Sequence, residues 1–132
     1  MKNLCIIPAR GGSKRIPRKN VKDFLGKPII AYSIEAALNS GLFDEVMVST
    51  DDQEIAEVAK KYGAKVPFMR SAEAANDFAT TRDVLNEVLA QYKSLGKTFD
   101  AMCCVYATAP LVTSNDIVNA YQLLNQSNFA CV

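Results

Sequence analysis

The sequence predicts an α/β fold, a Rossmann-like three-layer α/β/α sandwich with a mainly parallel sheet. Two observations support this prediction. Short apolar runs alternate along the chain with longer segments in which apolar residues recur every three or four positions, which is typical of parallel β-α-β units. The first apolar run, Leu4 to Ile7, has no charged residue, as expected for a strand buried on both faces.

The next elements follow from local signals. Pro28 can open a helix and Gly41 can close it, because proline is favoured in the first turn and glycine just past the last. Its expected inner face consists of Ile30, Ile34, Ala37 and Leu38. A second strand is expected over Glu45 to Ser49.

Asp51 and Glu54 have the spacing of a capping box and predict the start of another helix. The inner face of that helix is expected to consist of Ile55, Val58, Ala59 and Tyr62. Gly63 can end the helix, and Lys65 to Met69 is expected to form a third strand.

The second half of the chain repeats the alternation. A helix is predicted from Thr81 to about Leu95, a fourth strand over Ala101 to Tyr106, and a helix from Thr113 or Ser114 to about Asn125. The apolar stripes of the two helices consist of Val84, Leu85, Val88, Leu89 and Tyr92, and of Ile117, Tyr121 and Leu124. Phe129 to Val132 begins a further apolar run.

The 132 residues form about one domain's worth of chain. No repeat or linker divides them, so residues 1–132 are predicted to be a single domain. Because a buried strand rarely ends a doubly wound sheet, the run Phe129 to Val132 indicates the N-terminal half of a longer chain. The alternative is a small complete domain that ends in a central strand.

Composition excludes several function classes. The net charge of +1 argues against a general nucleic-acid or membrane-surface binder. The absence of histidine excludes serine–histidine and cysteine–histidine catalysis, and the four cysteines lack C-x-x-C spacing. No signal peptide or membrane-length apolar stretch is visible, so we expect a cytoplasmic protein without membrane attachment.

Positive charge is concentrated just after the first strand. Six basic residues lie between Arg10 and Lys22 without an acid, which leaves nine basic and fourteen acidic residues for the rest of the chain. Ligands of open α/β sheets bind at the carboxyl ends of the strands. A focus of charge at that place attracts a compact anion better than a long polyanion.

The peptide backbone of the same segment is suited to bind a phosphate. Gly11 and Gly12 lack a Cβ, so their N–H groups can approach a phosphate closely, and Ser13 can add a hydroxyl. The spacing fits neither the dinucleotide-binding nor the P-loop motif. The alternative is a solvated basic loop.

The basic side chains of the segment can neutralise a triphosphate and the pyrophosphate that is released from it. Arg10 offers a planar fork for bidentate contact, whereas Lys14 and Lys19 act as point charges.

Five blocks of sequence resemble one enzyme family. IIPARGGSKRIPRKN, FLGKPIIAYSIEAAL, DEVMVSTDD, RSAEAANDFATT and YATAP are similar, in order and spacing, to the CMP-sugar synthetases, the cytidylyltransferases of nine-carbon keto-sugar acids. The resemblance covers essentially all 132 residues and implies the nucleotide-diphospho-sugar transferase type of α/β fold. It also implies transfer of CMP from CTP to a 2-keto-3-deoxy sugar acid, with release of pyrophosphate.

The blocks CCVYATAP and NDFATT are most similar to members of the family that act on pseudaminic acid, so this sugar is favoured. The alternatives are an N-acylneuraminate (sialic acid) cytidylyltransferase and a noncatalytic nucleotide-binding fragment.

The resemblance also assigns residues. It places phosphate-binding, catalytic cations at Arg10 and Lys19. The implied CTP contacts are Ala9, Arg10, Gly11, Gly12, Ser13, Lys14, Lys19, Asn20, Arg70, Thr80 and Thr81. Tyr106 stands where the family has glutamine, and it can contact the sugar or base or pack in the core.

The resemblance further implies Mg²⁺, whose family aspartates lie beyond residue 132, and a homodimer for the full-length protein. No metal ligand is therefore expected within this chain. The pair Asp51 and Asp52 would suit magnesium, but the helix that follows favours a capping role. Asp77 is interpreted as a turn residue.

Overall fold

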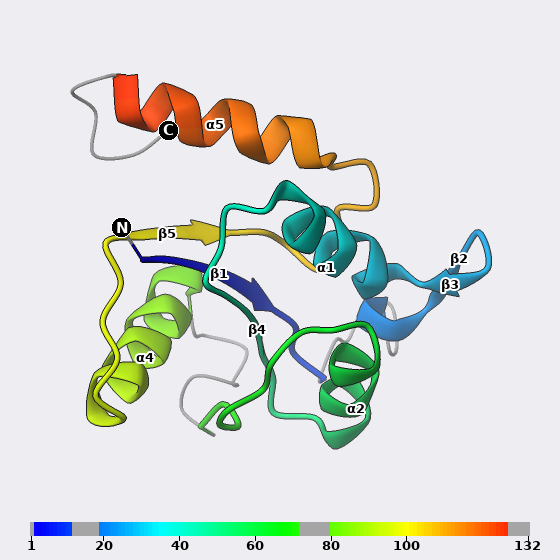
Figure 1. Ribbon diagram of the computed structural model, residues 1–132. Helices are drawn as coiled ribbons and strands as arrows, with labels where there is room; N and C mark the ends of the chain where they lie inside the picture. The colour runs from blue at the N-terminus through cyan, green and yellow to red at the C-terminus, as the bar shows by residue number, and fades with distance from the viewer. Residues whose placement is uncertain (1, 12–18, 72–79, 127–132) are drawn as a thin grey trace.

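The computed structural model describes residues 2–11, 19–71 and 80–126. Three strands, β1 (Asn3–Pro8), β4 (Glu45–Ser49) and β5 (Ala101–Cys104), form a parallel sheet in the order β4-β1-β5. The predicted α/β class with a mainly parallel sheet is confirmed. Figure 1 shows the arrowheads of β1 and β5 pointing to the same side of the molecule, so their carboxyl ends share one edge of the sheet.

Four helices and a small hairpin complete the described fold. The helices are α1 (Ile29–Ser40), α2 (Gln53–Lys61), α4 (Thr81–Ser94) and α5 (Ser114–Gln126). A 3-10 turn, η1 (Lys19–Val21), leads into the antiparallel hairpin of β2 (Asp23–Phe24) and β3 (Lys27–Pro28). This hairpin was not expected from the sequence. Leu25 and Gly26 in its turn both adopt positive φ angles.

The central strand β1 divides its side chains between the two faces of the sheet. Leu4 and Ile6 belong to one buried apolar cluster, and Cys5 and Ile7 belong to the other. This alternation is the two-residue period of a strand, and both sets are fully buried because helices cover both faces. The continuous apolar run therefore forms the two-sided strand that it predicted.

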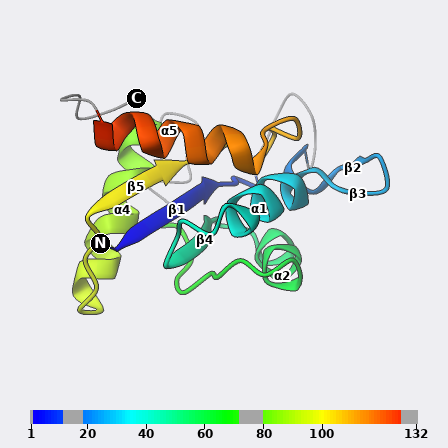
Figure 2. The ribbon, with the colours of Figure 1, turned by 45° about the horizontal axis from the view of Figure 1, so that its top comes forward.

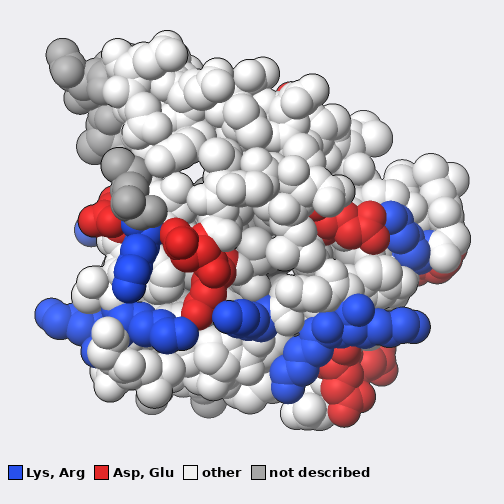
Figure 3. All heavy atoms as spheres, viewed as in Figure 1, with Lys and Arg blue, Asp and Glu red and all other residues white. Residues whose placement is uncertain are grey.

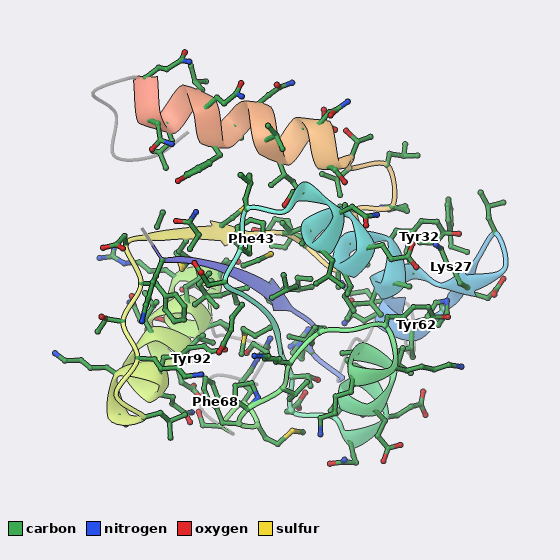
Figure 4. The ribbon with its side chains drawn as sticks, in the orientation of Figure 1. Lys27, Tyr32, Phe43, Tyr62, Phe68 and Tyr92 are labelled. Carbon is green, nitrogen blue, oxygen red and sulfur yellow. The ribbon has the colours of Figure 1, made fainter. Side chains whose placement is uncertain are left out.

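The helices form the outer layers of the sandwich. Helices α1, α2 and α5 contribute to the cluster that contains Cys5 and Ile7, whereas α4 covers the opposite face through Val88 and Tyr92. Figure 2 shows α1 in front of the strands and α4 behind them. Tyr92 packs edge-on against two rings at 5.2–5.3 Å between centroids, and Figure 4 shows one of them, Phe68, close by.

The helix ends follow the predicted signals with one correction. Gly41 ends α1 in the left-handed conformation, and its N–H donates to the carbonyl of Leu38. Thr80 and Asp83 form a reciprocal capping box on α4. The residue that caps α2 is Asp52, one position later than the predicted Asp51, because the Asp52 carboxylate accepts the N–H of Ile55 at 3.1 Å.

Three details of the predicted elements are wrong. Lys65 to Met69 is not a strand: Lys65 makes a single parallel bridge to Met47, and Pro67 has no N–H for a continued ladder. Leu38 is 43% exposed and does not belong to the inner face of α1. Strand β5 ends at Cys104 rather than Tyr106. The predicted strand from Phe129 to Val132 lies outside the described residues.

Candidate functional site

The carboxyl ends of β1 and β4 form the floor of the candidate site. The ladder between these strands continues one residue past β1, where the N–H of Ala9 donates to the carbonyl of Ser49 at 2.9 Å. Arg10 and Gly11 then leave the sheet beside the turn that connects β4 to α2. The basic segment therefore begins at the ligand-binding edge expected for this class of fold.

Gly11 lies tightly against that turn. Its N–H donates to the Asp51 carboxylate at 3.0 Å, and a Cβ at this position would stand 2.7 Å from the Cβ of Asp52. Only glycine permits this approach without displacing Asp52. The glycine thus has a structural function in addition to the phosphate contact, which stays a prediction. Gly12, Ser13 and Lys14 lie outside the described residues.

Asn20 fixes the chain on both sides of the basic segment. Its side chain is 4% exposed, and its amide donates to the carbonyl of Arg10 at 2.7 Å. This bond keeps Arg10 close to η1, in which Lys19 is exposed. The two predicted phosphate-binding cations therefore lie at the same edge of the sheet.

Arg70 is anchored to the end of β4. Its guanidinium donates to the carbonyl and hydroxyl of Ser49 at 2.7 and 3.2 Å, and its N–H donates to the carbonyl of Thr50 at 2.7 Å. Burial lowers the pKa of Arg70, and the charges of Asp51 and Glu87 offset part of this effect. Arg70 thus reaches the predicted edge, although the segment before it is not a strand.

The side chains of Thr81 and Tyr106 lie next to each other at the candidate site. Their hydroxyl oxygens are 3.3 Å apart, and the Tyr106 carbonyl accepts a bond from the buried Ser33 at 2.7 Å. The Tyr106 side chain is 58% exposed, which argues against the core-packing alternative. The hydroxyl of Thr80 caps α4, whereas the hydroxyl of Thr81 lies on the surface beside that of Tyr106. The two threonines therefore have different roles.

Two residues of this edge had no signal in the sequence. Glu87 accepts bonds from both the N–H and the hydroxyl of Ser71 at 2.9 and 2.8 Å, which holds the chain just after Arg70. Ser33 supports Tyr106 from α1. Both contacts join segments far apart in the sequence, so helical periodicity could not reveal them.

The described residues contain no group of three cysteine or acidic side chains placed to hold a metal ion. Asp51 accepts a bond from Gly11, and Asp52 caps α2. The capping interpretation therefore holds for Asp52, whereas Asp51 bonds to Gly11 instead. None of the described helices combines the length and apolarity needed to cross a bilayer.

The hairpin next to the site is held by Lys27. Its ammonium lies 4.5 Å from the centre of the Tyr32 ring and 2.6 Å from the carboxylate of Glu35, and Figure 4 shows Lys27 and Tyr32 side by side. Phe24 packs edge-on against the same ring.

In Figure 3, charged side chains of both signs cover the lower part of the face, whereas α5 is almost uncharged.

The chain is similar in sequence and in fold to known proteins. A family model described as cytidylyltransferase matches residues 4–131. Pseudaminic acid cytidylyltransferase of Campylobacter jejuni is 57% identical over 98% of this chain and 56% of its own length. CMP-N,N'-diacetyllegionaminic acid synthase of Legionella pneumophila is 39% identical over 93% of this chain and 53% of its own.

Among solved structures, CMP:2-keto-3-deoxy-manno-octonic acid synthetase complexed with CTP superimposes with a TM-score of 0.80 at 30% identity, over 96% of this chain and 48% of that one. The chain therefore spans about half the length of the relatives it matches. Because the family model covers residues 4–131 and the parallel sheet is confirmed, the chain belongs to the cytidylyltransferase family.

Proposed function

We propose that the full protein containing this chain transfers CMP from CTP to a nine-carbon 2-keto-3-deoxy sugar acid and releases pyrophosphate. Pseudaminic acid is the favoured acceptor, because the relative that is 57% identical is a pseudaminic acid cytidylyltransferase. The observation that carries the proposal is the meeting of Arg10, Gly11 and Arg70 at the carboxyl edge of β1 and β4.

The reaction is an in-line displacement at the α-phosphorus of CTP. The anomeric hydroxyl of the sugar acid loses its proton and forms the new P–O bond, and the bond to the pyrophosphate oxygen breaks. Such transfers depend mainly on positioning and charge neutralisation. Arg10 and Lys19 supply positive charge for the leaving pyrophosphate, and Asn20 holds the Arg10 backbone in place.

The remaining residues of the edge hold the substrates. Arg70, anchored on Ser49, is proposed to contact the nucleotide, together with Ala9, Asn20, Thr80 and Thr81. Tyr106 is proposed to contact the sugar or the base through the hydroxyl that lies beside Thr81. The contacts proposed for Gly12, Ser13 and Lys14 stay predictions from the sequence.

Magnesium is proposed as the cofactor of the full protein. It would neutralise the phosphate oxygens of CTP. The described residues hold no carboxylate cluster that fits it. That its ligands lie beyond Val132 is implied only by the family resemblance and stays a prediction. A homodimer and a cytoplasmic location also stay predictions.

The test is pyrophosphate release by the purified full protein with CTP, Mg²⁺ and either pseudaminic acid or N-acetylneuraminic acid. The proposal predicts the larger kcat/KM with pseudaminic acid. A larger value with N-acetylneuraminic acid would favour the sialic acid alternative, and CTP binding without turnover on either sugar would favour a noncatalytic nucleotide-binding protein.

A further inference from the structure

Asp51 is an acidic residue at the edge that is proposed to bind polyphosphate. Its carboxylate is exposed and accepts the N–H of Gly11 at 3.0 Å. It also interacts favourably with the charge of Arg70. The helix that follows does not need this carboxylate, because Asp52 caps α2. The position of Asp51 therefore requires a different explanation.

The Asp51 carboxylate makes the contacts that a phosphate oxygen would make. An anion at this edge would accept the N–H of Gly11 and lie near the charges of Arg10 and Arg70. One N–H cannot donate a strong bond to two acceptors at once, and two adjacent anions repel each other. A phosphate that binds Gly11 must therefore displace the Asp51 carboxylate.

The geometry points to Asp51 as an internal counter-ion of the nucleotide site, which holds Gly11 through its N–H and gives way to a phosphate oxygen when a nucleotide binds. This inference rests on the proposed function and deepens it. Asp51 is a positioning residue whose charge weakens the binding of CTP and of pyrophosphate. Asp51 thus weakens the binding of CTP and, by the same repulsion, speeds the release of pyrophosphate.

Two other roles make different predictions for Asp51→Asn, which keeps an oxygen acceptor and removes the charge. If Asp51 only tethers Gly11, the variant should bind CTP as the wild type does. If Asp51 is a magnesium ligand, the variant should bind Mg²⁺–CTP more weakly. An internal counter-ion predicts tighter binding, because the repulsion disappears while the tether remains.

The experiment is calorimetric titration of the full protein with CTP, pyrophosphate and uncharged cytidine, each with and without Mg²⁺. In Asp51→Asn, the Kd values for CTP and pyrophosphate should fall by about threefold to tenfold, the range expected for one partly screened charge near the surface. The Kd for cytidine should stay unchanged. Asp51→Glu, which keeps the charge, should not bind CTP or pyrophosphate more tightly than the wild type.

Asp100→Asn is the matched control. Asp100 is exposed and accepts a backbone N–H, that of Lys2, at 2.7 Å. It precedes β5 and so lies at the opposite end of the sheet. The substitution makes the same change in net charge and should leave all three Kd values unchanged.

The outcomes separate the inference from the proposed function. If the wild type binds CTP and Asp51→Asn binds CTP and pyrophosphate equally well or more weakly, the counter-ion role is refuted and the proposed function stands. If the wild type binds no CTP, both are refuted. In steady-state kinetics, the inference predicts that the inhibition constant for pyrophosphate falls by the same factor as the Kd.

Discussion

Gly11→Ala tests the close packing at the floor of the site. The new Cβ would stand 2.7 Å from the Cβ of Asp52 and 2.8 Å from its carboxylate oxygen, whereas carbon atoms prefer separations of about 3.5–4.0 Å. One of the two segments must therefore move by about 1 Å. Asp52 cannot move freely, because its carboxylate accepts the N–H of Ile55 and caps α2.

The expected cost combines two effects. Overpacking costs about 1–3 kcal/mol, and loss of a helix cap costs about 1 kcal/mol. We therefore expect Gly11→Ala to lower the free energy of unfolding by about 2–4 kcal/mol, and the midpoint of thermal unfolding by about 7–14 °C. Circular dichroism is the suitable probe, because the chain has no tryptophan.

A double-mutant cycle supplies the control. Asp52→Gly removes the clashing Cβ and keeps a residue that is tolerated at an N-cap. Gly11→Ala should therefore cost at least about 1 kcal/mol less in the Asp52→Gly background. An alanine variant as stable as the wild type, or an undiminished cost in that background, would refute the packing argument.

Three further predictions concern other parts of the chain. Burial raises the pKa of Glu45, but the bond from Lys97 and the nearby lysine charges outweigh this effect, so the pKa is lowered. The ionised carboxylate should therefore stabilise the fold above the unfolded pKa of about 4.3, and this stabilisation should be lost as the pH falls further. In urea titrations, Glu45→Gln should lose less free energy of unfolding on acidification than the wild type, and an identical loss would contradict this. Thr80→Ala should destabilise the protein by about 1 kcal/mol through loss of the capping box, and Thr80→Ser should restore it; a neutral alanine variant in thermal unfolding would argue against the cap. Tyr106→Phe should raise KM for the sugar acid by about threefold to tenfold, the effect of one lost hydrogen bond, with a smaller change in KM for CTP; unchanged kinetics would remove Tyr106 from the substrate site.

The sequence predicted the parts of the fold that depend on local chemistry. The run Leu4 to Ile7 lies within β1, and Glu45 to Ser49 is β4, because strands buried on both faces need continuous apolar residues. Gly41 marked the end of α1, since it adopts a conformation that favours glycine. The segment around Pro67 was misassigned, because apolar composition alone does not show that a ladder bond is missing.

The candidate site was predictable in position but not in detail. Arg10 follows β1, so its place at the sheet edge could be expected from the order of the elements. Arg70 was expected there at the end of a strand, whereas the segment before it makes a single bridge to β4. The bond from Gly11 to Asp51 and the approach of Thr81 to Tyr106 depend on how separate elements pack. Neither contact has a signature in the spacing of residues along the chain.

The edge formed by β1 and β4 is proposed to hold the polyphosphate of a cytidine nucleotide. The most direct measurement is a crystal structure of the full protein with CTP. We expect the triphosphate to lie against Ala9 to Gly11, within hydrogen-bond distance of Arg10 and Lys19. A nucleotide bound elsewhere, with this edge empty and Gly11 still bonded to Asp51, would contradict it.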